Sequence, residues 1–451
     1  MKQAISYRDN SGFVILKNDS VFRFVSREYA AQYDMLMQSG LYQELVDEGL
    51  LIPHRENLMT AQEKAAYHKV LVPERIFCIT YPYEWTTEQW KQVLLQFLQI
   101  NTMALRYGMI LKDATPFNFS FQGRHCIFID TLSFEFYKEG TPWIAYRQFC
   151  ESMLGPFALM TFNHDNWGRY LSASINGFEL PFISRNLKRR SWFDLTAVLH
   201  LHWHAKYTDR DGGAHRSSMS RQKLQLLWSM LRRGIGKWKT KNAGRRWTKY
   251  YDIDIASTEY MDDKTAQLVF VLQALQPRSV IDLGANTGRF SLLAARYAGQ
   301  VIAVEADQAC VRILQEQLAA QSLSNITTIL ADIVVPTPGL GWNNSERLPL
   351  LHRLQGELVM ALALVHHLCI ARNIPIEFVA EMLAAISLNY AVVEFIPKSD
   401  PKVAGMLAGR EDIFNDYHEE SFIHHFSRYF VLMRSHAIAS SGRTLFIWKK
   451  K

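Results

Sequence analysis

The segment VIDLGANTG at 280–288 constrains the fold more than any other part of this chain. It reads as an apolar strand that enters a turn containing Gly284 and Gly288, followed by a helix at 290–297. A second apolar strand then ends in Glu305. Glycines let the backbone bend sharply and lie close to a ligand, and a helix start offers free N–H groups to an anion. The pattern predicts half of a nucleotide-binding βαβ unit, in which Glu305 can accept hydrogen bonds from ribose hydroxyls.

The spacing of these residues lacks the G-x-G-x-x-G pattern of dinucleotide-binding proteins. Asp282-x-Gly284-x-Asn286-x-Gly288 instead resembles the first motif of class I S-adenosylmethionine-dependent methyltransferases, with Asn286 where a middle glycine often stands. The resemblance implies S-adenosylmethionine as the cofactor, with Glu305 at its ribose and Asp332 at its adenine amino group. The donor-binding residues implied in this way are Asp282, Gly284, Ala285, Asn286, Gly288, Glu305 and Asp332.

The rest of the C-terminal half follows the strand order of that family. The run ELVMALAL at 357–364 is continuously apolar, which is typical of a central strand buried on both faces. Further strands are expected at 326–332, 390–395, 429–433 and 444–448. The resemblance covers residues 255–451 and implies an α/β fold with a Rossmann-like, doubly wound sheet of seven strands, the final one antiparallel.

Three polar side chains follow the expected strands at their carboxyl ends, where ligands bind in such sheets. His366 and His367 follow the apolar run, and Glu394 lies near the exit of the strand at 390–395. Methyl transfer needs donor and acceptor held in line away from water, and a base only if the acceptor must lose a proton. These three residues are the candidate catalytic groups. The alternative is that a histidine caps a helix and that Glu394 is a structural hydrogen-bond partner.

A second constellation lies in the N-terminal half. Asp113, Asn118 and Asp130 have the spacing of the catalytic core of protein kinases and aminoglycoside phosphotransferases, which the segment resembles. The resemblance implies an α+β kinase-like domain in which these residues bind Mg-ATP. The sequence departs from the family, because Leu111 replaces a histidine, Thr131 replaces a phenylalanine, and the glycine-rich loop and its lysine are missing. The alternative is that Asp113 and Asn118 only form a turn.

A basic segment separates the two halves. Residues 216–250 contain eleven Lys or Arg and no Asp or Glu, against a net charge of +7 for the whole chain. We therefore expect a kinase-like domain at 1–212, a basic, Trp-containing linker or helical segment at 213–254, and a methyltransferase domain at 255–451. A basic, Trp-containing segment can contact a polyanion, either nucleic acid, phosphorylated glycan or lipid headgroups. The alternative is a solvated helix with a linker.

The sequence composition limits the cellular compartments and the metal sites that we expect. No apolar run is long enough to span a membrane, and the N-terminus lacks the apolar core of a signal peptide. The five cysteines form no C-x-x-C pair, and on a helix only His200 and His204 of the three histidines at 200–204 would share a face, so no metal site is expected. These features favour a cytoplasmic protein, with a position at a membrane surface left open.

Three functions remain compatible with the sequence. The leading one is a methyltransferase with an accessory kinase-like domain and an unidentified acceptor. The missing Asn-Pro-Pro-Tyr motif favours an oxygen acceptor, and the basic segment favours an anionic one. The second is a bifunctional enzyme that phosphorylates and methylates the same acceptor. The third is a scaffold that binds two ligands without reaction.

Overall fold

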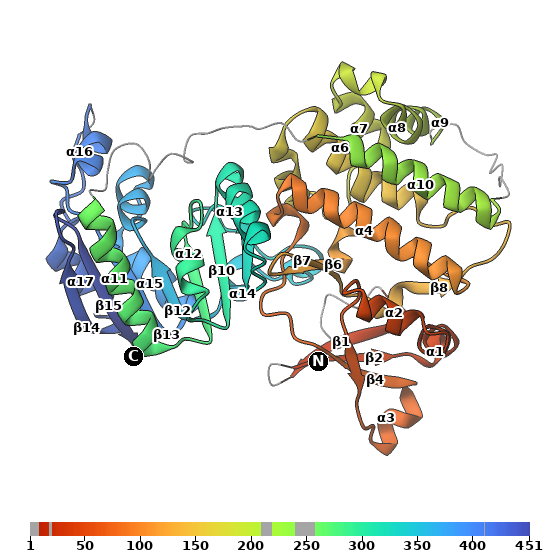
Figure 1. Cartoon of the computed structure of the whole chain (residues 1–451), viewed down its shortest axis with the longest axis horizontal. Helices are drawn as coiled ribbons and strands as arrows, with labels where there is room; N and C mark the ends of the chain where they lie inside the picture. Colours follow the sequence, from red (N-terminus) through yellow and green to blue (C-terminus); the bar gives the residue numbers. More distant parts are fainter. Residues whose placement is uncertain (1–8, 18–19, 209–218, 240–257, 410) are drawn as a thin grey trace. The chain divides into compact units, whose positions relative to one another are not determined.

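The computed structural model describes residues 9–17, 20–208, 219–239, 258–409 and 411–451 (Figure 1). The chain divides into two compact units. Unit 1 consists of residues 1–243 together with 339–348, and unit 2 consists of 244–338 together with 349–451. The short segment 339–348 therefore leaves the second unit in sequence and folds with the first.

Unit 2 is built on a seven-stranded sheet with the order β11-β10-β9-β12-β13-β15-β14. Strands β9 to β13 pair in parallel, whereas β15 is antiparallel to both of its neighbours. The seven strands and the antiparallel last strand are those expected from the sequence. The strands are β9 (Ser279–Leu283), β10 (Gln300–Glu305), β11 (Ile326–Leu330), β12 (Gly356–Ala361), β13 (Ser387–Phe395), β14 (Phe430–Ala437) and β15 (Thr444–Lys450).

Helices cover both faces of this sheet. Val392 of β13 belongs to a buried cluster that includes side chains of α11, α12 and α13. Phe395, which lies on the other side of the same strand, packs against Phe422 of α17 with ring centroids 5.2 Å apart. The main helices of unit 2 are α11 (Thr258–Leu275), α12 (Arg289–Ala294), α13 (Gln308–Ala320), α14 (Leu350–Arg353), α15 (Ile376–Ile386), α16 (Pro401–Leu407) and α17 (Glu419–Phe426).

Unit 1 begins with a four-stranded antiparallel sheet in the order β1-β2-β4-β3. Its strands are β1 (Gly12–Lys17), β2 (Ser20–Val25), β3 (His54–Glu56) and β4 (Lys69–Pro73), with α1 (Ala30–Gln38), α2 (Leu41–Asp47) and α3 (Ala61–Ala66) between them. The long helix α4 (Thr87–Arg106) follows, and Thr86 caps it by accepting from the backbone N–H of Gln89. Two short pairs come next, β5 (Met109–Leu111) with β8 (Phe134–Phe136) and β6 (Phe119–Gln122) with β7 (His125–Phe128).

The remainder of unit 1 is helical. Its helices include α6 (Gly155–Phe162), α7 (Leu180–Asn186), α8 (Leu195–Ala197), the π-helical segment η9 (Val198–Trp203), α9 (His204–Thr208) and α10 (Arg221–Lys237). Helix α10 lies within the segment expected at 213–254, yet it belongs to unit 1 and packs on α4. It does so because every third or fourth residue is apolar and buried, namely Leu224, Trp228, Leu231 and Ile235.

The described part of the basic segment therefore contributes buried tryptophans to the core of unit 1 and exposed cations to its surface. Trp228 and Trp238 are buried in the core of unit 1, and the indole N–H of Trp238 donates to Asp194 at 3.0 Å. The outer side of α10 carries exposed cations, including Arg232 and Arg233. Residues 213–218 and 240–254 of the expected linker, including Trp247, lie outside the described residues.

The packing of α10 predicts a large effect for one substitution. Trp228→Ala should lower the free energy of unfolding of unit 1 by about 3–5 kcal/mol, because the buried ring leaves a cavity. Urea unfolding followed by far-UV circular dichroism measures this change. Leu226→Ala is the matched control, since Leu226 lies on the same helix with 60% of its surface exposed. Equal midpoints for the two variants would contradict the assignment of α10 to the core.

Candidate functional site

In the turn after β9, every second residue has a left-handed backbone conformation. Gly284, Asn286 and Gly288 have φ angles of 71°, 51° and 85°. A Cβ atom on Gly288 would lie 2.2 Å from Leu314 Cδ1, so only glycine lets α13 pack against the start of α12. Asparagine tolerates the left-handed region better than most residues, which explains how Asn286 replaces a glycine.

This turn is attached to the neighbouring strand. The backbone N–H groups of Gly284 and Ala285 both donate to the carbonyl of Val304, at 2.9 and 3.1 Å. The carboxylate of Glu305 accepts from the backbone N–H of Asn286 at 2.8 Å. Glu305 therefore points at the turn, and the ends of β9 and β10 form one structure.

Glu305 retains capacity for a ligand. Its carboxylate also accepts from the backbone N–H groups of Ala306 and Asp307, at 2.7 and 2.8 Å. Burial raises the pKa of this carboxyl group, while the backbone donors act in the opposite direction. Since two carboxylate oxygens offer about four lone-pair sites, at least one site remains for a hydroxyl donor.

Asp282 lies deeper than the sequence suggests. Its side chain is 2% exposed and accepts from the Ser291 hydroxyl at 2.5 Å. Burial raises its pKa to about 6. The carboxylate thus links β9 to α12.

Asp332, after β11, is partly buried. It accepts from the backbone N–H of Val334 at 3.0 Å and pairs with Arg372 at 3.3 Å. Sequence reasoning did not single out Arg372.

The histidine pair follows β12 and is buried. His366 has no exposed surface, and neither of its ring nitrogens has a hydrogen-bond partner within the described part of the chain. Burial lowers the pKa of His366 to about 2 and that of His367 to about 4. The two rings lie 4.1 Å apart between centroids. Both imidazoles are neutral at physiological pH, and such weakly basic rings orient a partner by hydrogen bonding better than they hold a proton.

Glu394 lies in a buried ionic network. Its carboxylate contacts Lys264 Nζ at 2.5 Å and accepts from the Tyr260 hydroxyl at 2.6 Å. Arg443 lies 3.6 Å from Glu394 and 2.8 Å from Asp400. Burial alone would raise the pKa of Glu394, but the cations of Lys264 and Arg443 hold it below its ordinary value. Glu394 is therefore a fixed anion that joins α11, β13 and the start of β15.

No sequence signal marks this network. Lys264 and Tyr260 lie on α11, far from Glu394 in the chain, and a lysine within a helix is ordinarily solvated. The ion pair forms only because the tertiary structure places α11 over the end of β13.

The structure also brings the N-terminal candidates together. Asp130 forms an ion pair with Arg23 of β2. Burial raises the pKa of Asp113; Lys112 acts to lower it, and the nearby Asp130 acts to raise it. The carbonyl of Asn118 accepts from the backbone N–H of Ile129 at 2.8 Å, which places the turn beside the strand exit. In this arrangement the charge of Asp130 is balanced by an arginine.

His200 and His204 share Tyr146 as a partner, whereas His202 has different partners, as expected for a helix on which only residues four apart lie on one face. His200 bonds the Tyr146 hydroxyl at 2.7 Å, and the ring of His204 stacks on that of Tyr146 with centroids 4.9 Å apart. His202 bonds two serine hydroxyls. Within the described residues no three His, Cys, Asp or Glu side chains group as metal ligands.

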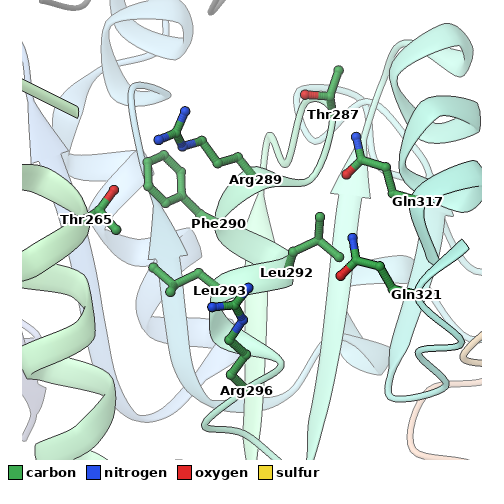
Figure 2. A pocket seen from close by; sticks show the side chains of 9 residues that line it. All are labelled: Thr265, Thr287, Arg289, Phe290, Leu292, Leu293, Arg296, Gln317 and Gln321. Carbon is green, nitrogen blue, oxygen red and sulfur yellow. The ribbon is translucent and has the colours of Figure 1, made fainter. Parts of the chain in front are cut away.

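A cavity of about 410 Å³ lies between α11, α12 and α13. Figure 2 shows Thr287 of the glycine turn, with Arg289 and Phe290 at the start of α12, and Arg296 farther along the chain. None of the expected donor-binding residues lines this cavity. The cavity therefore borders the turn without being the crevice at the ends of β9 and β10.

Comparisons with known proteins give one relative along nearly the whole chain. No protein-family model matches. The nodulation protein NoeA of Rhizobium meliloti (strain 1021) is 30% identical over 461 residues, which span 99% of this chain and 95% of NoeA. The 23S rRNA (uracil(1939)-C(5))-methyltransferase RlmD of Marinomonas posidonica is 33% identical over 93 residues, 20% of this chain and 21% of RlmD.

Solved structures resemble a part of the chain. The N-methyltransferase NodS from Bradyrhizobium japonicum WM9 is 9% identical, with a TM-score of 0.33, over 43% of this chain and 98% of NodS. The magnesium protoporphyrin IX methyltransferase ChlM from Synechocystis PCC 6803, with bound S-adenosylmethionine, is 15% identical, with a TM-score of 0.31, over 44% of this chain and 86% of ChlM.

The buried network predicts an asymmetric response to mutation. Lys264→Met should destabilise unit 2 by about 3–5 kcal/mol, because it leaves the Glu394 anion buried beside a weakened set of partners. The double variant Lys264→Met with Glu394→Gln should recover part of that loss, since the unpaired charge is removed. Chemical unfolding of both proteins measures the difference. A single variant as stable as the wild type would show that the pair contributes nothing.

Proposed function

This chain belongs to the family of the nodulation protein NoeA, and we propose that it is an S-adenosylmethionine-dependent methyltransferase with its donor site at the carboxyl edge of the sheet in unit 2. One observation carries the proposal. The Glu305 carboxylate at the end of β10 meets the backbone of the left-handed turn after β9, at Asn286. An acceptor-only group beside a turn that a ligand can approach closely is what a ribose and its attached chain require.

The residues of the turn fit the donor. A Cβ atom on Gly284 would lie 3.3 Å from Leu364, so glycine keeps the backbone open there. Gly284, Ala285 and Gly288 would border the donor through their backbones, Glu305 would hold its ribose, and Asp332 its adenine. Asp282 would act through Ser291 by keeping the turn in place. When bound, the donor supplies a methyl group activated by a sulfonium.

The histidine pair would face the acceptor. The unpartnered nitrogens of His366 lie buried beyond the end of β12, and such groups are costly unless something bonds them. Hydrogen bonds from His366 and His367 would orient the acceptor, and their burial would exclude water. Glu394, bonded to Lys264, Tyr260 and Arg443, would position this edge of the sheet instead of accepting a proton.

The acceptor proposed is an oxygen nucleophile on an anionic molecule. Arg443, Lys402 and Lys264 all contribute positive potential at His366. Lys264 and Arg443 are themselves paired with Glu394 and Asp400, and the positive influence that still reaches His366 supports a negatively charged partner at the histidines. The exposed cations of α10 are consistent with polyanion contact through the basic segment, whether the polyanion is nucleic acid, glycan or lipid.

Removal of the Glu305 carboxylate, which we propose to bind the ribose of the donor, should abolish most donor binding. Glu305→Ala should weaken S-adenosylmethionine binding by about 10- to 100-fold, because hydrogen bonds to a carboxylate are lost. Isothermal titration calorimetry measures the affinity. Asp307→Ala is the control, since Asp307 lies two residues away and caps α13 through the backbone N–H of Ala309. An unchanged affinity in Glu305→Ala would refute the donor site.

A second function has one observation in its favour. Asp113 and Asp130 are close enough for their charges to interact. A kinase-like unit that binds Mg-ATP would need these two carboxylates near each other. The Arg23 guanidinium, however, already balances Asp130, the carboxylate that would hold magnesium. We therefore favour an accessory kinase-like unit over a bifunctional kinase-methyltransferase, with a two-ligand scaffold as the remaining alternative.

Calorimetry with Mg-ATP separates these alternatives. An accessory unit whose Asp130 is neutralised by Arg23 should bind Mg-ATP weakly or not at all and release no ADP. Tight binding that is lost in Asp130→Asn, together with ATP turnover, would favour the bifunctional enzyme. Donor binding without transfer of a radiolabelled methyl group to any fraction of cell extract would favour the scaffold.

A further inference from the structure

One end of unit 1 exposes large apolar side chains that a solvated surface rarely shows together. Phe193 is 92% exposed, Leu195 is 66% exposed, and Trp192 and Trp203 are 52% and 50% exposed. They lie in and between α8, η9 and the short helix at 189–193, and α7, α8 and α9 are neighbours in Figure 1. Grouped exposure of this kind marks an interaction site.

A buried histidine holds these elements in place. His202, only 2% exposed, bonds Ser184 of α7 through Nδ1 and Ser191 through Nε2, each at 2.8 Å. The ring of Trp192 stacks on that of His202, with centroids 3.9 Å apart. Trp192 therefore lies beside the helix that carries Trp203, and the exposed side chains are fixed on a rigid base.

The same region is positively charged without counterions. Arg185, Lys188, Arg189 and Lys206 are exposed, and none forms an ion pair with a described acidic residue. From 180 to 208 the sequence contains a single acidic residue, Asp194. That carboxylate is engaged elsewhere, because it accepts from the backbone N–H of Ala197 at 2.9 Å and from the Trp238 indole at 3.0 Å.

We propose that this basic-aromatic surface, formed by the four cations above with Trp192, Phe193, Leu195 and Trp203, binds the surface of an anionic phospholipid bilayer. The indole N–H groups of Trp192 and Trp203 have no partner within the described residues, and half-exposed indoles suit the headgroup level of a membrane. Lysine and arginine beside them match anionic headgroups, while Phe193 and Leu195 enter the acyl boundary. The inference is independent of the donor site in unit 2.

A bilayer fits this surface better than a nucleic acid does. Single-stranded nucleic acids stack their bases on aromatic rings, and the aliphatic Leu195 adds nothing to such a platform. Both Phe193 and Leu195 gain by leaving water for an apolar phase. None of the described helices meets the length and hydropathy needed to cross a membrane, so contact would be interfacial.

Vesicle co-sedimentation of the full-length protein tests the proposal. The wild type should sediment with phosphatidylglycerol vesicles and much less with phosphatidylcholine vesicles. Phe193→Ser with Leu195→Ser should weaken binding to phosphatidylglycerol by at least about tenfold, because two apolar side chains no longer insert. Lys188→Glu with Arg189→Glu should weaken it by a similar factor and remove the dependence on salt.

The matched control is Leu58→Ser, since Leu58 is 95% exposed elsewhere in unit 1 and should leave binding unchanged. Urea unfolding midpoints equal to that of the wild type would show that unit 1 of each variant is folded. The proposal is overturned if the wild type ignores phosphatidylglycerol, or if Phe193→Ser with Leu195→Ser binds as the wild type does. It is also overturned if those substitutions instead abolish RNA binding or dissociate a dimer in light scattering.

Discussion

The attachment of the glycine turn to β10 is the constraint on which the donor site depends. Gly284 and Ala285 share the carbonyl of Val304, and Asn286 donates to Glu305. These bonds fix the left-handed positions in a shape that few sequences adopt, and Gly288 lets α13 approach α12. Without them the ends of β9 and β10 would not present backbone and carboxylate to the same ligand.

The buried ionic network of unit 2 links α11 to β13 and to the start of β15, near the carboxyl edge of the sheet. Lys264, Glu394, Arg443 and Asp400 are charged and almost wholly enclosed. Buried ions are costly unless each has partners, and here each has at least one at hydrogen-bond or ion-pair distance. The result is a rigid polar wall next to His366, whose nitrogens remain without partners. A buried imidazole without hydrogen-bond partners lowers stability, so its position in rigid surroundings is better explained by ligand binding.

Unit 1 shows the opposite balance. Asp130 and Arg23 satisfy each other, and Lys112 reaches Asp9 at 3.2 Å and Ser11 at 2.6 Å. Charges that balance internally leave little attraction for a metal ion. The unbalanced charge of this unit lies instead on its outer surfaces, on α10 and around α7 to α9. Within the described residues, the charges of unit 1 that lack partners are therefore on its surface, whereas the ionic network of unit 2 is buried.

Local patterns in the sequence were sufficient for the sheet of unit 2 and its glycine turn, because strand hydrophobicity and glycine placement act over a few residues. The sequence alone also determined the positions of Glu305 and the histidine pair at strand ends. Only the tertiary structure decided that α10 packs as core, that Lys264 neutralises Glu394, and that Arg23 neutralises Asp130. Each of these contacts joins residues far apart in the chain, and burial and charge pairing depend on which distant side chains folding brings together.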